Sequence, residues 1–235
     1  AVARTLAVAP VHLPVALATA HAALPVGARW RGTLEGWDPA ALVPVLEGGG
    51  FAVHACRATR AAAVMVGVER LRTLPDFVGP GLRLLVVGLN PSWYSADAGV
   101  GFARPGNRFW PAALAAGLVT CDRDPWHAIR VDRVGMTDLV KRPSVAAAEL
   151  TTAEYRSGLA RVRALVEWLR PGAVCFLGLA GWRAAVDRRA VAGVQDGDLG
   201  GVAVYVMPNP SGLNAHDTVA TLAAHLRAAQ DLGAG

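Results

Sequence analysis

Beyond residue 81 the chain repeats one pattern, in which a short, continuous apolar run precedes a longer amphipathic stretch. The runs "LRLLVVGL", "AVCFLGL" and "VAVYVM" are typical of strands that are buried on both faces of a parallel sheet. "DRVGMTDLV" adds a weaker fourth run. Strands that alternate with helices predict an α/β fold, a three-layer, doubly wound sandwich with a central, mostly parallel sheet.

Two amphipathic stretches predict the clearest helices. "TTAEYRSGLARVRALVEWLRPG" begins with a Thr that can cap a helix and ends at Pro-Gly, and "DTVATLAAHLRAAQ" predicts a second helix further on. The apolar stripe of the first helix consists of Leu159, Val162, Val166 and Leu169. Three arginines fall mostly off that stripe and are expected to face solvent rather than DNA, namely Arg156, Arg163 and Arg170.

The strongest boundary signal is "LPDFVGPG", residues 74–81, where Pro and Gly cluster between two apolar runs. Before it, the pattern predicts a helix over about residues 39–46 and strands over residues 51–56 and 62–68. This order resembles the last helix and strand pair of class I methyltransferases. No glycine-rich cofactor loop precedes it, however, so methyl transfer is not implied.

The composition fits a globular protein and not a disordered chain, because 53% of the 235 residues are hydrophobic and 17% are charged. The length suits one well-cored domain with an attachment. We expect a main domain over residues 78–235 and a small N-terminal α/β extension over residues 1–77. Residues 6–24 carry no formal charge, but interrupting prolines and histidines argue against a targeting segment or a membrane span.

The formal net charge of +5 permits a polyanionic partner, although proteins that never bind nucleic acid often share such an excess. Lys141 is the only lysine. Arginine suits bidentate contacts to phosphate, and a genome-wide bias in composition explains the preference equally well. The three cysteines lie far apart without a C-x-x-C pair, which predicts reduced thiols in a cytoplasmic protein and no cysteine-based metal site.

Three loops that follow predicted strands hold the unusual polar residues: "GLNPSWYSADAGVGFARPGNRFW", "GMTDLVKRP" and "MPNPSGLNAH". The carboxyl ends of parallel strands meet at one edge of a sheet, so Asn90, Asp138 and Asn209 are expected around one cleft. The loops carry no G-x-G-x-x-G, G-x-x-x-x-G-K-[ST] or G-x-S-x-G motif. The sequence therefore argues against a dinucleotide oxidoreductase, a P-loop NTPase and an α/β-hydrolase.

In this order and spacing, "GLNPS", "ARPGNRFW", "GMTDLVKRP" and "NPSGLNA" resemble the motifs of the mismatch-specific uracil and thymine DNA glycosylases. These enzymes form a branch of the uracil-DNA glycosylase superfamily, and the resemblance covers roughly residues 81–232. It implies an enzyme of base excision repair that flips uracil out of double-stranded DNA and hydrolyses its glycosidic bond, which leaves an abasic site. It also implies a monomer that uses no metal and no cofactor, with DNA containing uracil or a mismatched base as its partner.

The resemblance implies two catalytic side chains. Asn90 matches the family's water-positioning asparagine, since a carboxamide holds water by hydrogen bonds and takes no proton. Taken alone, the same motif also suits an Asn that caps a turn before Pro91. Asp138 stands where relatives also carry Lys or Asn. A carboxylate there assists water attack or stabilises the cationic sugar, and the alternatives are a helix N-cap or a partner for Lys141 or Arg142.

Further motif positions are implied to bind the flipped uracil. Phe102 matches the aromatic residue that stacks on the base, and backbone N–H groups over residues 91–94 are expected at the uracil carbonyls. Ser92 stands where the family often has Gly and is expected to narrow the pocket. Asn209 replaces the catalytic His of the main uracil-specific branch, so weaker assistance to the leaving group is expected. The other expected substrate-binding residues are Gly88, Leu89, Pro91 and Asn107.

The last loop resembles the segment with which the family fills the hole left by the flipped base. The residues implied to enter the duplex are Ser211, Gly212, Leu213 and Asn214. Leu213 is the apolar wedge, and its polar neighbours lie near the opposing base. Ala215 stands where close bacterial relatives carry Arg, so a contact to phosphate or to the opposing base is absent or is supplied elsewhere, for example by His216.

Three cations are expected near DNA phosphates, namely Arg108, Lys141 and Arg142. For Arg108 the resemblance implies either a phosphate contact or the ordering of a loop. Phe109 and Trp110, which follow it in the motif, are expected in the core.

The motifs together predict a monofunctional DNA glycosylase that removes uracil, preferably opposite guanine. One alternative is a glycosylase for another base, such as thymine, hypoxanthine or a damaged pyrimidine. The other is a lesion-binding module without turnover, which would have no need of the pair Asn90 and Asp138. A methyltransferase fragment is disfavoured because the cofactor loop is missing.

Overall fold

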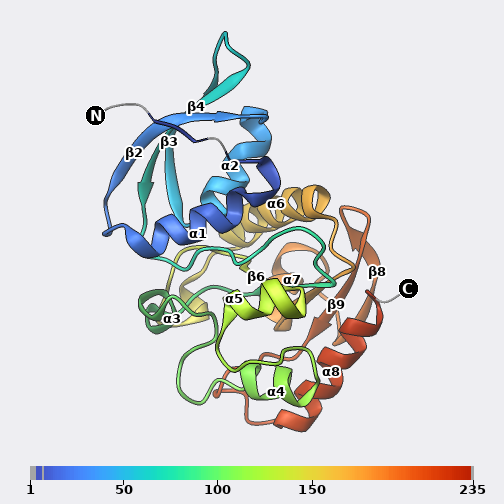
Figure 1. The fold of residues 1–235 in the computed structure, drawn as a ribbon. Helices are drawn as coiled ribbons and strands as arrows, with labels where there is room; N and C mark the ends of the chain where they lie inside the picture. Colours follow the sequence, from blue (N-terminus) through green and yellow to red (C-terminus); the bar gives the residue numbers. More distant parts are fainter. Residues whose placement is uncertain (1–3, 7, 234–235) are drawn as a thin grey trace.

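The computed structural model describes residues 4–6 and 8–233, and two sheets organise them (Figure 1). The first sheet has four strands in the order β1-β2-β4-β3, with β1 parallel to β2 and the other pairs antiparallel. Its strands are β1 (Arg4–Leu6), β2 (Arg29–Glu35), β3 (Phe51–Ala58) and β4 (Ala63–Arg70). The short helix η1 (Pro10–His12) leads into α1 (Leu13–Ala23), and α2 (Pro39–Gly48) joins β2 to β3. These elements, β1 to β4 with the three helices, are called the N-terminal unit below.

The second sheet has five strands in the order β6-β5-β7-β9-β8. Four of them are parallel, and only β8 at the edge runs antiparallel to its neighbour β9. The strands are β5 (Leu84–Gly88), β6 (Val134–Asp138), β7 (Ala173–Leu177), β8 (Gly193–Leu199) and β9 (Val202–Met207). The predicted α/β fold with a central, mostly parallel sheet is confirmed.

Helices cover both faces of the second sheet and make three layers (Figure 1). One face packs against α4 (Phe109–Ala115) and α8 (Val219–Asp231), and the other against α6 (Thr152–Leu169) and α7 (Leu179–Ala185). The remaining short elements are α3 (Trp93–Ala98), α5 (Pro125–His127), η2 (Ala128–Asp132) and η3 (Ala147–Glu149).

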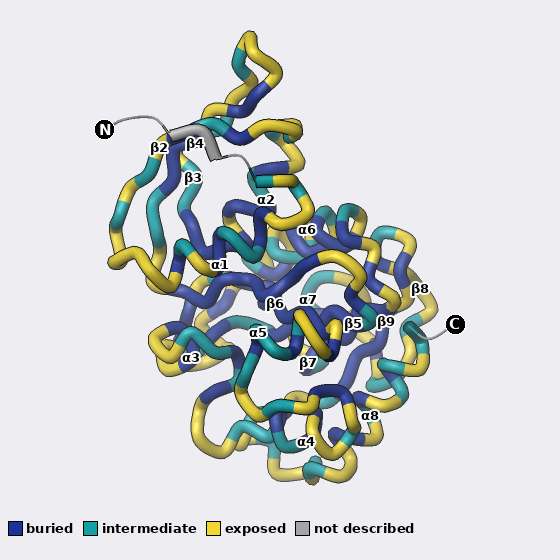
Figure 2. The backbone as a smooth tube through the Cα atoms, viewed as in Figure 1, coloured by how far each residue is buried: buried dark blue, intermediate teal, exposed yellow. Residues whose placement is uncertain are grey.

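The side chains of β5 show why its sequence is apolar throughout. Leu84 and Val86 join the cluster under α4 and α8, whereas Leu85 and Val87 join the cluster under α6. Successive side chains of a strand point to opposite faces, so a strand between two helix layers buries every position. Figure 2 shows this burial along the central strands, whereas exposed residues lie in the loops and on the outer sides of the helices.

The N-terminal unit packs on α6, and the segment that follows the unit pairs with the main sheet. Trp37, just before α2, lies 5.0 Å from Trp168 of α6 between ring centroids. Phe77 pairs with Met136 of β6 in an isolated antiparallel bridge. Asp76 donates its backbone N–H to the carbonyl of Gly48, the last residue of α2. The division of the chain at residue 77 stays a prediction.

Most predicted elements agree with the structure. The expected helix over 39–46 is α2, and the expected strands over 51–56 and 62–68 are β3 and β4. Thr151 caps α6 by accepting the backbone N–H of Glu154. The three arginines expected to face solvent from the predicted helix, Arg156, Arg163 and Arg170, are exposed.

Among the elements that the sequence pattern does not predict are α1, β2 and β8. Helix α1 is apolar around much of its circumference and has no side-chain cap, so neither periodicity nor capping marks it. Strand β2 carries charged and apolar residues in no simple alternation, and β8 is a polar edge strand. In the described part of the chain, no helix combines the length and apolarity needed to cross a membrane.

Candidate active site

A cavity of about 140 Å³ opens at the carboxyl ends of the parallel strands. The loops after β5, β6 and β9 reach it together with the segment over 101–107. Predicted site residues that line it are Leu89, Asn90, Pro91, Ser92, Phe102, Asn107, Asp138, Asn209 and Ser211. The structure thus brings Asn90, Asp138 and Asn209 to one cavity, as the convergence of strand ends predicts.

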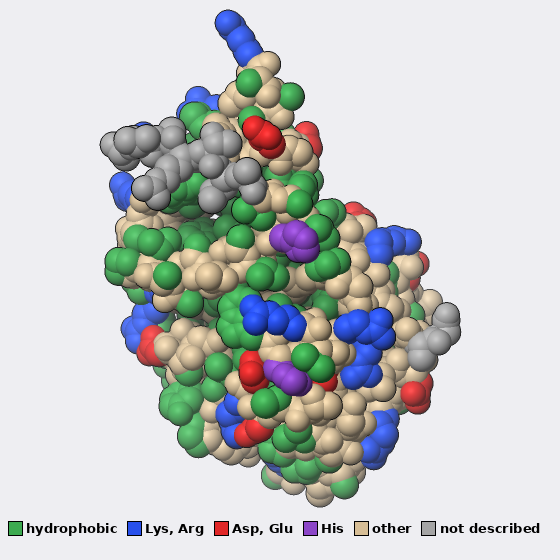
Figure 3. Space-filling view, in the orientation of Figure 1, with side chains coloured by type: hydrophobic (Ala, Val, Ile, Leu, Met, Phe, Trp, Pro, Cys, Tyr) green, Lys and Arg blue, Asp and Glu red, His purple; other side chains and the backbone are tan. Residues whose placement is uncertain are grey.

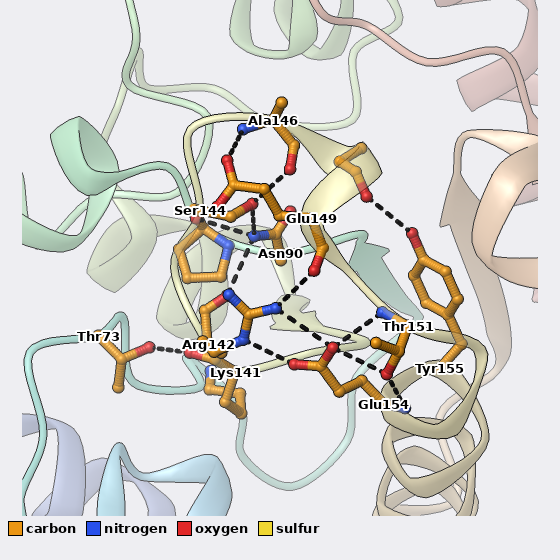
Figure 4. Close-up of polar contacts among 12 residues, drawn as sticks. Thr73, Asn90, Lys141, Arg142, Ser144, Ala146, Glu149, Thr151, Glu154 and Tyr155 are labelled. Carbon is orange, nitrogen blue, oxygen red and sulfur yellow. Dashed lines mark hydrogen bonds and ion pairs between the residues drawn. The ribbon is translucent and has the colours of Figure 1, made fainter.

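Asn90 is held by its amide nitrogen. Nδ2 donates to the carbonyl of Arg142 at 3.0 Å, to Oγ of Ser144 at 2.9 Å and, more weakly, to the carbonyl of Pro91 at 3.3 Å (Figure 4). Backbone carbonyls only accept hydrogen bonds, so these partners determine which end of the carboxamide is the nitrogen. Within the described residues the carbonyl oxygen of Asn90 has no protein partner, so it can accept a hydrogen bond from a ligand or a water in the cavity.

Asp138 is the last residue of β6 and pairs in register with Gly88 at the end of β5. A side chain at Gly88 would not fit, since a Cβ there would lie 2.6 Å from Oδ1 of Asp138 and 3.1 Å from the ring of Phe102. Burial raises the pKa of Asp138 to about 6; the nearby Lys141 lowers it and Asp76 raises it further. This carboxyl group is therefore poised to change protonation near neutral pH.

A charged network lies directly behind Asp138. Lys141 places Nζ 2.8 Å from Oδ1 of Asp76 and 3.9 Å from Oδ2 of Asp138. Arg161 of α6 donates to Oδ2 of Asp76 at 2.9 Å and to Oγ1 of Thr137 at 3.0 Å. Although burial opposes it, Lys141 and Arg161 hold the pKa of Asp76 below its usual range.

Sequence reasoning missed Asp76, Arg161 and Ser144. Asp76 lies in "LPDFVGPG", which looks like a linker, and Ser144 follows the recognised "GMTDLVKRP" motif. Arg161 had a usable signal, because it stands beside Val162 and four residues before Leu165, two residues of the buried face of α6.

Phe102 lies at the cavity wall with a left-handed backbone, φ 58°. Its ring packs on Phe109 with 4.4 Å between centroids, and the adjacent carbonyl of Gly101 accepts the indole N–H of Trp110 at 2.8 Å. Asn107 accepts the backbone N–H of Phe109 at the start of α4. Phe109 and Trp110 are fully buried, which confirms them as core residues that support this wall.

Ser92 caps α3 by accepting the backbone N–H of Ser95 at 3.1 Å, and both side chains line the cavity. Asn209 is exposed and accepts the backbone N–H of Ser211 at 2.9 Å. Its amide side chain therefore helps to shape the turn that it shares with the predicted intercalating segment.

The loop from 208 to 217 presents Leu213 to solvent, with 86% of the residue exposed. Arg108 organises this loop from inside, since its guanidinium donates to the carbonyls of Ser211, Asn214 and Asp217. The Asn214 amide also donates to the carbonyl of Asn209 at 2.9 Å. These hydrogen bonds hold the backbone carbonyls of the loop, and the apolar side chain of Leu213 projects from it.

Gly212 brings this loop against the preceding one. A Cβ at Gly212 would lie 2.8 Å from the carbonyl oxygen of Gly106, so the close approach of the two backbones requires glycine. The predicted residues of the "ARPGNRFW" and "NPSGLNA" motifs are therefore adjacent in the fold.

The cations expected at phosphates have protein partners. Arg142 is exposed and pairs with Glu154 at 2.6 Å, and it also donates to the carbonyl of Glu149 (Figure 4). Lys141 is mostly buried against Asp76. The contacts of Arg108 with three carbonyls of the 208–217 loop match the alternative in which this residue orders a loop. Binding of phosphate by these three residues stays a prediction.

The face shown in Figure 3 carries its positive charge in separate places. On this face, Lys and Arg side chains form several separate groups, one of them at the tip of the hairpin between β3 and β4. Arg104 lines the cavity and is exposed, and it takes part in none of the ion pairs among the described residues. The described residues contain no group of three or more His, Cys, Asp or Glu side chains placed to hold a metal ion.

Comparison with known proteins gives one family. The model of the uracil DNA glycosylase superfamily matches residues 75–233. Among solved structures, the fold is similar to the solution NMR structure of a provisionally assigned uracil DNA glycosylase from Methanosarcina acetivorans, with 19% sequence identity and a TM-score of 0.50. The similarity covers 68% of this chain and 97% of that chain. The segment before residue 75 lies outside the family match.

Proposed function

This chain belongs to the uracil DNA glycosylase superfamily, and we propose that it excises uracil flipped out of double-stranded DNA, preferably uracil opposite guanine. One observation carries the proposal: Asn90 and Asp138 line the same cavity, and the loop that also lines it through Ser211 projects Leu213 into solvent. A water-activating pair beside a pocket, with an apolar wedge near the mouth, meets the needs of a base-flipping hydrolase.

The reaction breaks the bond between C1′ of the deoxyribose and N1 of uracil. As that bond lengthens, the sugar gains oxocarbenium character and the base departs as an anion. A water adds its oxygen to C1′ and gives up a proton to a base of the enzyme. The uracil anion takes up a proton, and the products are free uracil and an abasic site. The enzyme therefore has to orient a water, remove its proton and stabilise two opposite charges.

We assign the orientation of water to Asn90 and the removal of its proton to Asp138. The amide nitrogen of Asn90 is anchored by two backbone carbonyls and Ser144, so its carbonyl oxygen can accept a hydrogen bond from the water without moving. With a pKa of about 6, Asp138 is mainly ionised at neutral pH and yet basic enough to take a proton. Its negative charge also stabilises the cationic sugar.

The flipped base is proposed to stack on Phe102, whose ring is braced by Phe109. Ser92 and the backbone N–H groups near it face the carbonyls of the base. Asn209 can donate a hydrogen bond to the departing oxygen but carries no positive charge, so leaving-group stabilisation is weaker than a protonated His would supply.

Leu213 is proposed to fill the hole in the stack. A U·G mismatch is easier to open than a U·A pair, and for that reason a site with modest leaving-group assistance favours the mismatch. Residues of the loop anchored by Arg108 would then lie against the opposing base.

The test is incubation of the purified protein with labelled duplexes that carry U opposite G, U opposite A, T opposite G or hypoxanthine opposite T. A single strand with U completes the set, and alkali then cleaves any abasic product. Cleavage that is fastest for U·G supports the proposal. Preference for T or hypoxanthine would change the assigned base, and binding without cleavage of any substrate would replace the enzyme by a lesion-binding module.

A further inference from the structure

Asp76 lies outside the recognised motifs and yet accepts hydrogen bonds from three side chains, which belong to β6, to the loop after it and to α6. Oδ1 accepts from Lys141 at 2.8 Å and from Oγ1 of Thr137 at 2.7 Å, and Oδ2 accepts from Arg161 at 2.9 Å. Asp76 is 3% exposed. A buried carboxylate with three donors, two of them cations, is strongly held and sets the positions of its partners in turn.

These contacts determine that the cations pair with Asp76 and not with Asp138. Lys141 is the nearest cation to the side chain of Asp138, but its Nζ is 3.9 Å from Asp138 and 2.8 Å from Asp76. Nη1 of Arg161 donates to Asp76, and Nη2 donates to Oγ1 of Thr137 and to the backbone carbonyl of Asp138. The carboxylate of Asp138 is consequently left without a close ion pair, although two cations lie near it.

The N-terminal unit holds Asp76 in place. The backbone N–H of Asp76 donates to the carbonyl of Gly48 at 2.8 Å. In the segment that joins the unit to Asp76, Thr73 donates its hydroxyl to the carbonyl of Lys141. A Cβ on Gly48 would lie 2.2 Å from Oδ2 of Asp76 and 3.0 Å from Nη1 of Arg161. The end of α2 is therefore packed directly on the ion pair between Asp76 and Arg161.

We propose that Asp76 is a positioning residue for Asp138: it binds Lys141 and Arg161 and so keeps both cations from pairing with the Asp138 carboxylate. The N-terminal unit supports the active site through the contact between Gly48 and Asp76. The inference rests on the proposed function, because it takes Asp138 as the proton acceptor. It gives the segment before residue 75 a role in the chemistry of a site to which it contributes no recognised motif.

The charged groups that act on Asp138 within the described residues are Lys141 after β6, Arg161 of α6 and Asp76 before β5. Gly88 of β5 and the ring of Phe102 also lie near it and carry no charge. Loss of the Asp76 charge removes a repulsion from Asp138 and frees Lys141 to approach it. Both effects lower the pKa of Asp138 and make it a weaker base.

The first experiment compares Asp76→Asn with the wild type in single-turnover excision from a U·G duplex between pH 4.5 and 9. We expect the acidic limb of the rate profile to move to lower pH by about one unit, and the plateau rate to fall roughly tenfold. Asp97→Asn is the matched control, because it removes the same charge from an exposed pair with Arg72, and its profile should stay in place. A lower plateau with an unmoved acidic limb would mean that Asp76 is only structural.

The second experiment keeps every charge and tests the contact from the N-terminal unit. Gly48→Ala should displace the pair of Asp76 and Arg161 and shift the acidic limb in the same direction by a smaller amount. The control is Gly49→Ala, in which the new methyl group would meet Leu17 at 2.8 Å instead. Equal profiles for Gly48→Ala and the wild type, or an equal shift in Gly49→Ala, would overturn the role of the N-terminal unit. The comparison of Gly48→Ala with Gly49→Ala also tests the proposal if Asp76→Asn does not fold.

A readout without DNA separates the two proposals. The ¹³Cγ resonance of Asp138, assigned by its loss in Asp138→Asn, reports the ionisation of this carboxyl group directly. We expect its titration midpoint to be lower in Asp76→Asn than in the wild type, and unchanged midpoints would sink the inference. If the wild type excises no base, the proposed function fails while this titration still tests the relation between Asp76 and Asp138.

Discussion

The amide nitrogen of Asn90 donates a hydrogen bond of 2.9 Å to Oγ of Ser144, a residue 54 positions further along the chain. Ser144 in turn donates to the carbonyl of Ala146 at 2.9 Å. The Ser144 hydroxyl therefore accepts from one side and donates to the other, which suits its single proton. The loop after β6 thus fixes the orientation of a side chain from the loop after β5.

Substitution Ser144→Ala should loosen Asn90 and leave its two backbone partners in place. The loss of one hydrogen bond of about 1 kcal/mol predicts a roughly fivefold slower single-turnover excision. Affinity for duplex DNA, measured by fluorescence anisotropy, should hardly change. Ser157→Ala, on the exposed face of α6, is the control. Equal rates for Ser144→Ala and the wild type would show that Ser144 does not position Asn90.

Asp138→Asn should slow excision about a hundredfold or more, with little loss of DNA binding, because the amide accepts no proton. In the wild type the pKa of Asp138 is raised to about 6 by burial. The active form is the carboxylate, so the rate should rise with pH through about 6 and level off above it. Single-turnover rates between pH 4.5 and 9 test both statements. A fully active Asp138→Asn protein would refute the role of Asp138 as the proton acceptor.

The same substitution should make the protein more stable at neutral pH. The folded-state pKa of Asp138 is raised from 3.8 to about 6, so the folded protein binds the proton more tightly than the unfolded chain does. This group's contribution is fully present below pH 3.8 and is lost as pH rises through about 6, a change of about 3 kcal/mol.

Denaturant unfolding of the wild type and Asp138→Asn at pH 4 and pH 7.5 measures this difference. The variant should gain stability over the wild type at the higher pH, and the gain should shrink toward pH 4. An advantage that is the same at both pH values would contradict a desolvated carboxylate.

Leu213→Ala should impair duplex substrates about tenfold, since a buried leucine contributes roughly 1.5 to 3 kcal/mol and alanine fills less of the stack. Single-stranded substrate has no hole to fill and should be cleaved at close to the wild-type rate. Because Leu213 is 86% exposed, the melting temperature should not change. Val191→Ala, another exposed apolar position, serves as the control. Equal losses on duplex and single strand would count against the wedge.

Arg108→Met should release the loop from 208 to 217, because the guanidinium bonds to three of its carbonyls. We expect faster amide hydrogen exchange in this loop and slower excision from duplexes. The salt dependence of DNA binding should match that of Arg60→Met, a charge control on the exposed β3–β4 turn. A slope of log K against log salt reduced by about one for Arg108→Met alone would indicate a phosphate contact instead.

The sequence placed the polar centre of the cavity because Asn90, Asp138 and Asn209 each lie at a strand end or two positions beyond it. Apolar runs marked β5, β6, β7 and β9, and parallel strand ends converge whatever the loops contain. The positions of Asn90 and Asp138 at neighbouring strand ends therefore predict that they lie together. The same reasoning could not reach Asp76 and Arg161, which are 85 residues apart and meet only across the packed layers.

By itself, the sequence determined where the main strands lie along the chain, their burial and the types of side chain at their ends. These properties depend on local apolar runs and on short motifs. Only the tertiary structure decided the environment of Asp138. Its pKa and its lack of a hydrogen-bonded ion pair depend on burial and on charges from three separate segments of the chain. Electrostatic energies in an interior vary with distances of an ångström, and spacing along a chain does not contain such distances.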